Sequence, residues 1–203
     1  RNGRGEGILG LRGAAFTAEH TIARDNATTG IAVFQGSTAE LSNSAMTGNR
    51  LGLDVGTGSS VVLRDAITIG QNSINGVEIN GEAVVELRAA NVNASGNGGV
   101  GISVGSGQLA IFAYPATPAS TLTANDNGFA GLIVGASRFT VYPAATVTAS
   151  GNGVFGILTG GFVVTTIDSG SRFIIEHNAV GLRFFMGGDA LIRGARLTVN
   201  GNG

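Results

Sequence analysis

The chain has 203 residues, of which 43% are hydrophobic, enough to form one sizeable core and to exclude disorder for lack of apolar surface. Its 12 basic and 13 acidic residues give a net charge of −1, which favours neither nucleic acid nor an anionic membrane surface as a partner. The absence of cysteine excludes disulfides and thiolate chemistry, and no apolar run reaches the ~18 residues of a membrane-spanning helix.

A glycine precedes a short apolar-x-apolar segment at regular intervals along the whole sequence. The apolar positions that follow it alternate with a period of two, which is typical of a β-strand with one buried face. These anchor glycines are Gly7, Gly30, Gly52, Gly76, Gly101, Gly131, Gly156 and Gly181, separated by 23, 22, 24, 25, 30, 25 and 25 residues. A fixed period of this length indicates a repeat architecture.

Two further alternating segments follow the anchor strand within each repeat. In one repeat the first carries Val61 and Leu63, and the second carries Ile67 and Ile69. Each repeat is therefore predicted to contain three short strands and three turns, and such a unit can bury its apolar face only by stacking on copies of itself. The sequence predicts an all-β fold, a parallel β-solenoid of about eight coils, with residues 1–203 forming one segment.

An asparagine lies three or four residues before almost every anchor glycine. Stacked coils would place these side chains above one another at about 4.8 Å, where amides can donate and accept along the axis as a ladder. We expect this structural role rather than ligand binding, with asparagine or glycine accommodating positive φ in the turn. The predicted ladder comprises Asn49, Asn72, Asn97, Asn127, Asn152 and Asn178, and Asn26 and Asn202 fit the same pattern.

One of these turns, Gly-Asn-Gly-Gly-Val-Gly at residues 96–101, matches the glycine pattern of a dinucleotide-binding loop. That motif requires a helix to begin directly after the glycines, so that the pyrophosphate meets a helix N-terminus. The residues that follow, 102–105, alternate as a strand instead. We therefore expect no nucleotide and no other cofactor.

The recurring pattern G-I-x-V, an alternating apolar pair and then T-x-A-x-G-N-G resembles the right-handed parallel β-helix repeats of the pectin-lyase-like superfamily. The resemblance covers essentially the whole chain and implies a right-handed helix in a secreted or surface-exposed bacterial protein. Because neither end shows a capping helix or polar cap, we expect the chain to be an excerpt of a longer β-helix, with self-association through rod ends or edges as one consequence.

Enzymes of this superfamily generally carry acidic residues on the outer face of one sheet. The corresponding outward positions here bring Asp54 and Glu78 into neighbouring coils, where they could divide acid and base roles in a polysaccharide lyase or glycoside hydrolase. The alternative is two solvated surface charges, paired with Arg64 or Arg88. The superfamily's N-x-D, G-H-G and R-x-K motifs are missing, which weakens the enzymatic hypothesis.

The longest repeat contains an insertion at residues 112–120, and insertions in repeat proteins map to surface loops that often bind partners. Its Tyr114 and Pro115 are echoed one repeat later by Tyr142 and Pro143, so the four residues form a candidate patch for a glycan or a protein. The alternative is a tolerated longer turn whose tyrosines cover the edge of the core.

These observations favour a non-enzymatic β-helical stalk, adhesin scaffold or interaction segment. A carbohydrate-active enzyme using the acidic pair is the alternative. No metal site is expected, because His20 and His177 belong to well-separated repeats.

Overall fold

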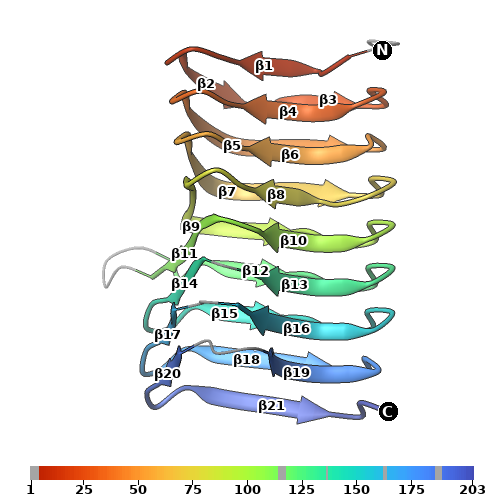
Figure 1. Ribbon diagram of the computed structural model, residues 1–203, viewed down its shortest axis with the longest axis vertical. Helices are drawn as coiled ribbons and strands as arrows, with labels where there is room; N and C mark the ends of the chain where they lie inside the picture. Colours follow the sequence, from red (N-terminus) through yellow and green to blue (C-terminus); the bar gives the residue numbers. More distant parts are fainter. Residues whose placement is uncertain (1–4, 114–117, 136, 162–163, 186–188) are drawn as a thin grey trace.

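The computed structural model describes residues 5–113, 118–135, 137–161, 164–185 and 189–203. Over these residues the chain forms 21 strands and no helix, and the strands stack along one axis with the two termini at opposite ends (Figure 1). Every pairing between neighbouring strands is parallel, as expected when each coil lies on the one before it. The prediction of an all-β parallel solenoid is confirmed.

The anchor strands form one sheet of eight strands, sheet A, with one strand from each coil. The strands are, in order, β1 (Ile8–Gly10), β4 (Thr29–Val33), β6 (Leu51–Val55), β8 (Val77–Ile79), β10 (Val100–Val104), β13 (Ala130–Val134), β16 (Phe155–Gly160) and β19 (Val180–Phe185). With a strand spacing of about 4.8 Å, these eight strands span roughly 34 Å along the axis.

The other two segments of each coil belong to a second, bent sheet of 13 strands, sheet B. Its strands are β2 (Ala15–Glu19), β3 (Ile22–Arg24), β5 (Thr38–Thr47), β7 (Ser60–Gly70), β9 (Ala83–Asn93), β11 (Gly107–Phe112), β12 (Thr121–Thr123), β14 (Arg138–Val141), β15 (Thr146–Thr148), β17 (Val164–Ile167), β18 (Arg172–Glu176), β20 (Asp189–Ile192) and β21 (Arg196–Asn200).

In three coils the two segments of sheet B are one strand of 10 or 11 residues rather than two short strands. Each long strand is bent at a single residue with positive φ: Asn43 in β5, Asp65 in β7 and Ala89 in β9. One left-handed residue turns the chain through a corner, where the pairing shows a local irregularity between Ser42 and Ser44 and between Leu63 and Asp65, and pairing continues on both sides of it. Three separate strands per coil, as predicted, appear in the first coil, where the bend is at His20, and in the later coils, where a wider turn replaces the bend.

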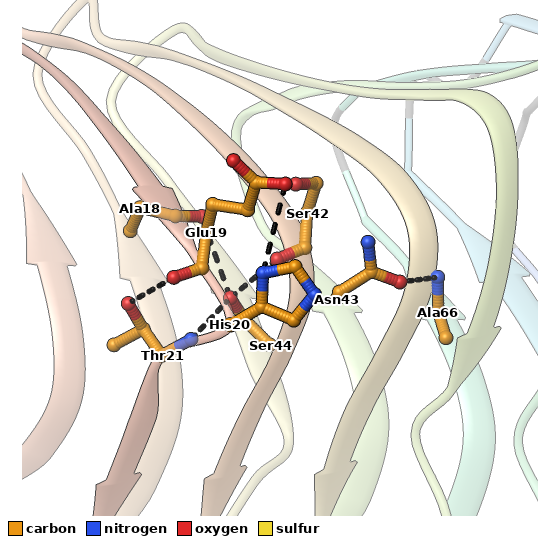
Figure 2. A network of polar contacts seen from close by, with 8 residues as sticks. All are labelled: Ala18, Glu19, His20, Thr21, Ser42, Asn43, Ser44 and Ala66. Carbon is orange, nitrogen blue, oxygen red and sulfur yellow. Dashed lines mark hydrogen bonds and ion pairs between the residues drawn. The ribbon is translucent and has the colours of Figure 1, made fainter.

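Figure 2 shows how the bend is held in the first coils. His20, which also has positive φ, donates its main-chain N–H to Ser42 O at 3.2 Å. The Ser44 hydroxyl accepts the N–H of Thr21 at 3.1 Å and donates to Ser42 O at 2.7 Å. The main-chain groups that the bend turns away from the ladder are thus satisfied by a serine side chain.

The core consists of aliphatic columns that run along the axis inside the coil. The inward column of sheet A is paired in register from strand to strand and is almost completely buried: Ile31, Leu53, Val77, Ile102, Leu132 and Ile157. Each such side chain contributes about 1.5–3 kcal/mol by leaving water. The period-two pattern read from the sequence corresponds to these columns.

Candidate functional surfaces

The asparagines form a continuous ladder at one corner of the coil. In each step the main-chain N–H and the Nδ2 of one asparagine donate to the Oδ1 of the next, at 2.8–3.2 Å. The members are Asn26, Asn49, Asn72, Asn97, Asn127, Asn152, Asn178 and Asn202. A second amide hydrogen donates to a carbonyl of the preceding coil, as from Asn97 to Ile69 O at 3.1 Å. The amides are occupied with one another, which leaves them no role in ligand binding.

Positive φ falls on the residue before each asparagine and not on the asparagine itself. The expectation that asparagine or glycine takes positive φ in this turn is therefore confirmed for glycine and wrong for asparagine. The eight residues alternate between side-chain-bearing types and glycine: Asp25, Gly48, Gln71, Gly96, Asp126, Gly151, His177 and Gly201. At two of the glycines the reason is steric, since a Cβ on Gly48 would lie 2.7 Å from Asp25 Oδ1, and one on Gly151 would meet the Asp126 carboxylate. The aspartate side chain of one coil thus lies against the turn glycine of the next coil.

Three glycines of the nucleotide-like stretch, Gly96, Gly98 and Gly101, are required for one of two structural reasons. Gly96 has a φ of +69°. A Cβ on Gly98 would collide with Ser73 O, and one on Gly101 would lie 2.6 Å from Gly131 O and 2.9 Å from an amide nitrogen of the ladder. The first glycine serves a left-handed turn, and the other two allow coils to approach closely.

The outer face of sheet A carries the acidic pair. One outward residue per strand forms a column in register, named here the outer column: Leu9, Ala32, Asp54, Glu78, Ser103, Ile133, Leu158 and Arg183. Asp54 and Glu78 are direct partners on β6 and β8, both half-buried. Burial, followed by repulsion from Glu78, raises the pKa of Asp54 to about 6. Glu78 Oε1 accepts a hydrogen bond from Asn75 Nδ2 at 2.8 Å.

The arginines expected beside this pair form ion pairs with other carboxylates. Arg64 Nε binds Glu40 Oε1 and Arg88 Nη2 binds Glu86 Oε2, each at 2.6 Å. Both ion pairs lie on sheet B, so the suggestion that Arg64 or Arg88 neutralises the acidic pair is wrong. Sequence position could not show this, because the corner between the sheets decides which face an arginine reaches.

Near the insertion, an aromatic stack follows the axis across three coils. The rings of Phe112 and Tyr142 stack with centroids 4.3 Å apart and an interplanar angle of 14°, and the Arg88 guanidinium lies 5.4 Å from the Phe112 centroid. Pro143 is exposed beside this stack, whereas Tyr114 and Pro115 lie outside the described residues. Because Phe112 lies between Arg88 of the coil before and Tyr142 of the coil after, its ring faces contact side chains of the protein itself.

Sequence reasoning missed Phe112 as the partner of Tyr142. The available signal was the register, which places Phe112 directly beside Arg88 on β9 and one coil before Tyr142. A second aromatic group was also missed, on the outer face of sheet A. There Arg183 lies 5.9 Å from the Phe155 centroid and 5.4 Å from that of Phe185, and Phe155 meets Phe129 edge to face with centroids 5.6 Å apart.

Metal binding finds no support within the described ranges. They contain no group of three histidine, cysteine, aspartate or glutamate side chains that could hold an ion. The two histidines lie at different corners, His20 at the bend of sheet B and His177 directly before the ladder residue Asn178. The same ranges include no helix long and apolar enough to cross a membrane.

The stacked parallel coils define a β-solenoid, a class of repeat protein. A family model described as "Right handed beta helix region" matches residues 1–113, more than half of the chain. The chain therefore belongs to the right-handed β-helix family, as its repeats predicted. A search among curated proteins returns no match. Membership identifies the architecture, while activity has to be argued from the surfaces.

Proposed function

We propose that the chain is a non-enzymatic β-helical scaffold, a stalk or interaction segment of a secreted or surface-exposed bacterial protein. The observation that carries the proposal is the asparagine ladder, which runs from the first coil to the last without interruption. A rod whose buried polar groups are satisfied coil by coil resists local opening, because each coil is bonded to both neighbours. The family resemblance supports the secreted setting.

Contacts that the charged and aromatic side chains make with one another also support a scaffold. The Arg64–Glu40 and Arg88–Glu86 pairs keep their charges within one face of sheet B. The Phe112–Tyr142 stack likewise uses ring faces between coils. A ligand at the insertion would therefore contact ring edges and Pro143 rather than lie flat on Phe112, which favours a protein partner over a stacked sugar ring.

Binding assays of the chain on cells, or on arrays of proteins and glycans, test this role. Shortening the insertion at residues 112–120 with Phe112 and Ser120 retained should abolish partner binding while the unfolding midpoint stays close to that of the wild type. The matched control is Asp54→Asn, which should leave binding unchanged. Wild-type binding after the insertion is shortened would refute the insertion as the binding site.

A carbohydrate-active enzyme is a second candidate, favoured by one observation. Asp54 and Glu78 lie on adjacent strands, about 4.8 Å apart at the main chain, and the pKa of Asp54 is raised to about 6. Retaining glycosidases use two neighbouring carboxyl groups, and different pKa values separate the acid from the nucleophile.

Turnover on a panel of neutral and acidic polysaccharides decides between the two. The enzyme hypothesis requires product release that disappears in Asp54→Asn and in Glu78→Gln, with both variants folded by circular dichroism. The scaffold proposal requires no turnover by the wild type. Release of product by the wild type and its loss in both variants would overturn the scaffold proposal for this segment.

A further inference from the structure

The outer face of sheet A is unevenly charged along the axis. Its acidic end carries Glu78 on β8 with Asp54 beside it, and its basic end carries Arg183 on β19. The residues between them in the outer column are Ser103, Ile133 and Leu158, which are uncharged and half-buried. Opposite charges therefore flank an apolar centre.

This face also permits close approach of a second surface. Beside the outer column lie Gly105 directly after β10, Gly135 directly after β13 and Gly160 at the end of β16, with the Asn80 and Phe185 side chains against the first and the last of them. Around its basic end the aromatic side chains stand in solvent, with Phe129 41% and Phe185 47% exposed. Exposed aromatic side chains are typical of protein–protein interfaces.

The spacing of the charges is symmetric about one strand. Glu78 lies two strands before β13 and Arg183 two strands after it, so each is about 10 Å from the Ile133 level. A two-fold axis that lies in the interface along β13 would place Ile133 against its own copy, Ser103 against Leu158 and Glu78 against Arg183. Such an interface is isologous, with every contact made twice.

We propose that this face is the interface of an antiparallel homodimer in which Glu78 of each copy pairs with Arg183 of the other. Asp54, one strand farther out, adds a second carboxylate near the same arginine. The parallel arrangement would oppose Glu78 to Glu78 and Arg183 to Arg183, and like charges facing each other select against it. This partner choice goes beyond the scaffold role and does not depend on the insertion.

The size of the face sets the strength of the dimer. The five strands from β8 to β19 cover about 20 Å along the axis and the strands are about 17 Å long, which gives a projected area of roughly 350 Å² per copy. The total buried area is then below about 1,200 Å², the range of weak, transient interfaces. The dimer should therefore form in a concentration-dependent way, visible by sedimentation equilibrium.

A charge swap tests the pairing. Glu78→Arg and Arg183→Glu should each weaken self-association by about tenfold or more, because each creates two like-charge contacts. An equimolar mixture of the two variants should restore association to the wild-type strength, because the heterodimer regains opposite charges at both contacts. Ile133→Ser should weaken the wild-type dimer without affecting which variants pair.

Arg196→Glu, an exposed position on sheet B, is the matched control with the same charge change as Arg183→Glu. It should dimerise like the wild type and should not complement Glu78→Arg. Circular dichroism and unfolding midpoints identify any variant that fails to fold, for which Glu78→Gln serves as a milder replacement. A monomeric wild type, unchanged association of the charge variants, or no recovery in the mixture would each overturn the proposal. Unchanged association is the outcome that end-to-end contacts would produce.

Discussion

Replacing Asn97 by alanine removes the amide from the middle of the ladder. The side chain is 2% exposed and makes four hydrogen bonds, two that its Oδ1 accepts from Asn72 and two that its Nδ2 donates, to Ile69 O and Asn127 Oδ1. The main-chain N–H of Asn72 would lose its partner inside the protein. With a net loss of about 1 kcal/mol per hydrogen bond and a larger penalty for the orphaned N–H, the free energy of unfolding should fall by about 4 kcal/mol.

Urea unfolding followed by far-ultraviolet circular dichroism measures this change. The matched control is Asn93→Ala, an exposed asparagine four residues earlier in the same coil, which should change the free energy of unfolding by less than about 0.5 kcal/mol. Asn97→Asp is a second probe, because it retains the acceptor but removes both donors. If Asn97→Ala and Asn93→Ala prove equally mild, the ladder does not stabilise the coil as argued.

Three further perturbations address the turns, the acidic pair and the aromatic stack. Gly101→Ala should unfold at a clearly lower urea concentration than Gly96→Ala, because the new Cβ at position 101 would lie 2.6 Å from a carbonyl oxygen. At position 96 the new Cβ has open space, and the variant loses only the ~1–2 kcal/mol that a left-handed conformation costs a residue with a side chain. Equal unfolding midpoints would contradict the steric argument. The pKa of Asp54 is raised from 3.8 to about 6, so the folded state binds this proton more tightly than the unfolded state. The free energy of unfolding should therefore fall as the pH rises from about 4 to 6. In urea titrations Asp54→Asn should lack this pH-dependent part of the stability. A double-mutant cycle of Phe112→Ala and Tyr142→Ala should give a coupling of about 0.5–1.5 kcal/mol, and a value near zero would show that the rings do not interact.

Much of the architecture could be predicted because a solenoid repeats its local pattern. The alternation at Val61 and Leu63 predicts a strand, and its recurrence in every repeat predicts the register that pairs Val61 with Val85. Asp54 and Glu78 could be assigned to adjacent strands on the same grounds. In such a fold, sequence separation translates directly into distance along the axis.

Features at the corners could not be predicted with the same success. Whether a corner is a one-residue bend or an open turn depends on φ at one position, and Ala89 is not a residue type that indicates positive φ. The direction in which a corner turns also decides which face an arginine reaches. For this reason Arg64 was assigned to the wrong carboxylate, and the contact between Arg183 and two phenylalanines was missed.

The sequence by itself determined the solenoid, the number of coils and the stacking of like residues, because period-two alternation and a constant repeat length are local properties of the chain. Only the tertiary structure decided how the outer surfaces are organised. The pKa of Asp54 and the stack of Phe112 on Tyr142 depend on desolvation and side-chain contacts between coils. These arise when about 25 or more residues of intervening chain have closed a full turn, and no local pattern encodes them.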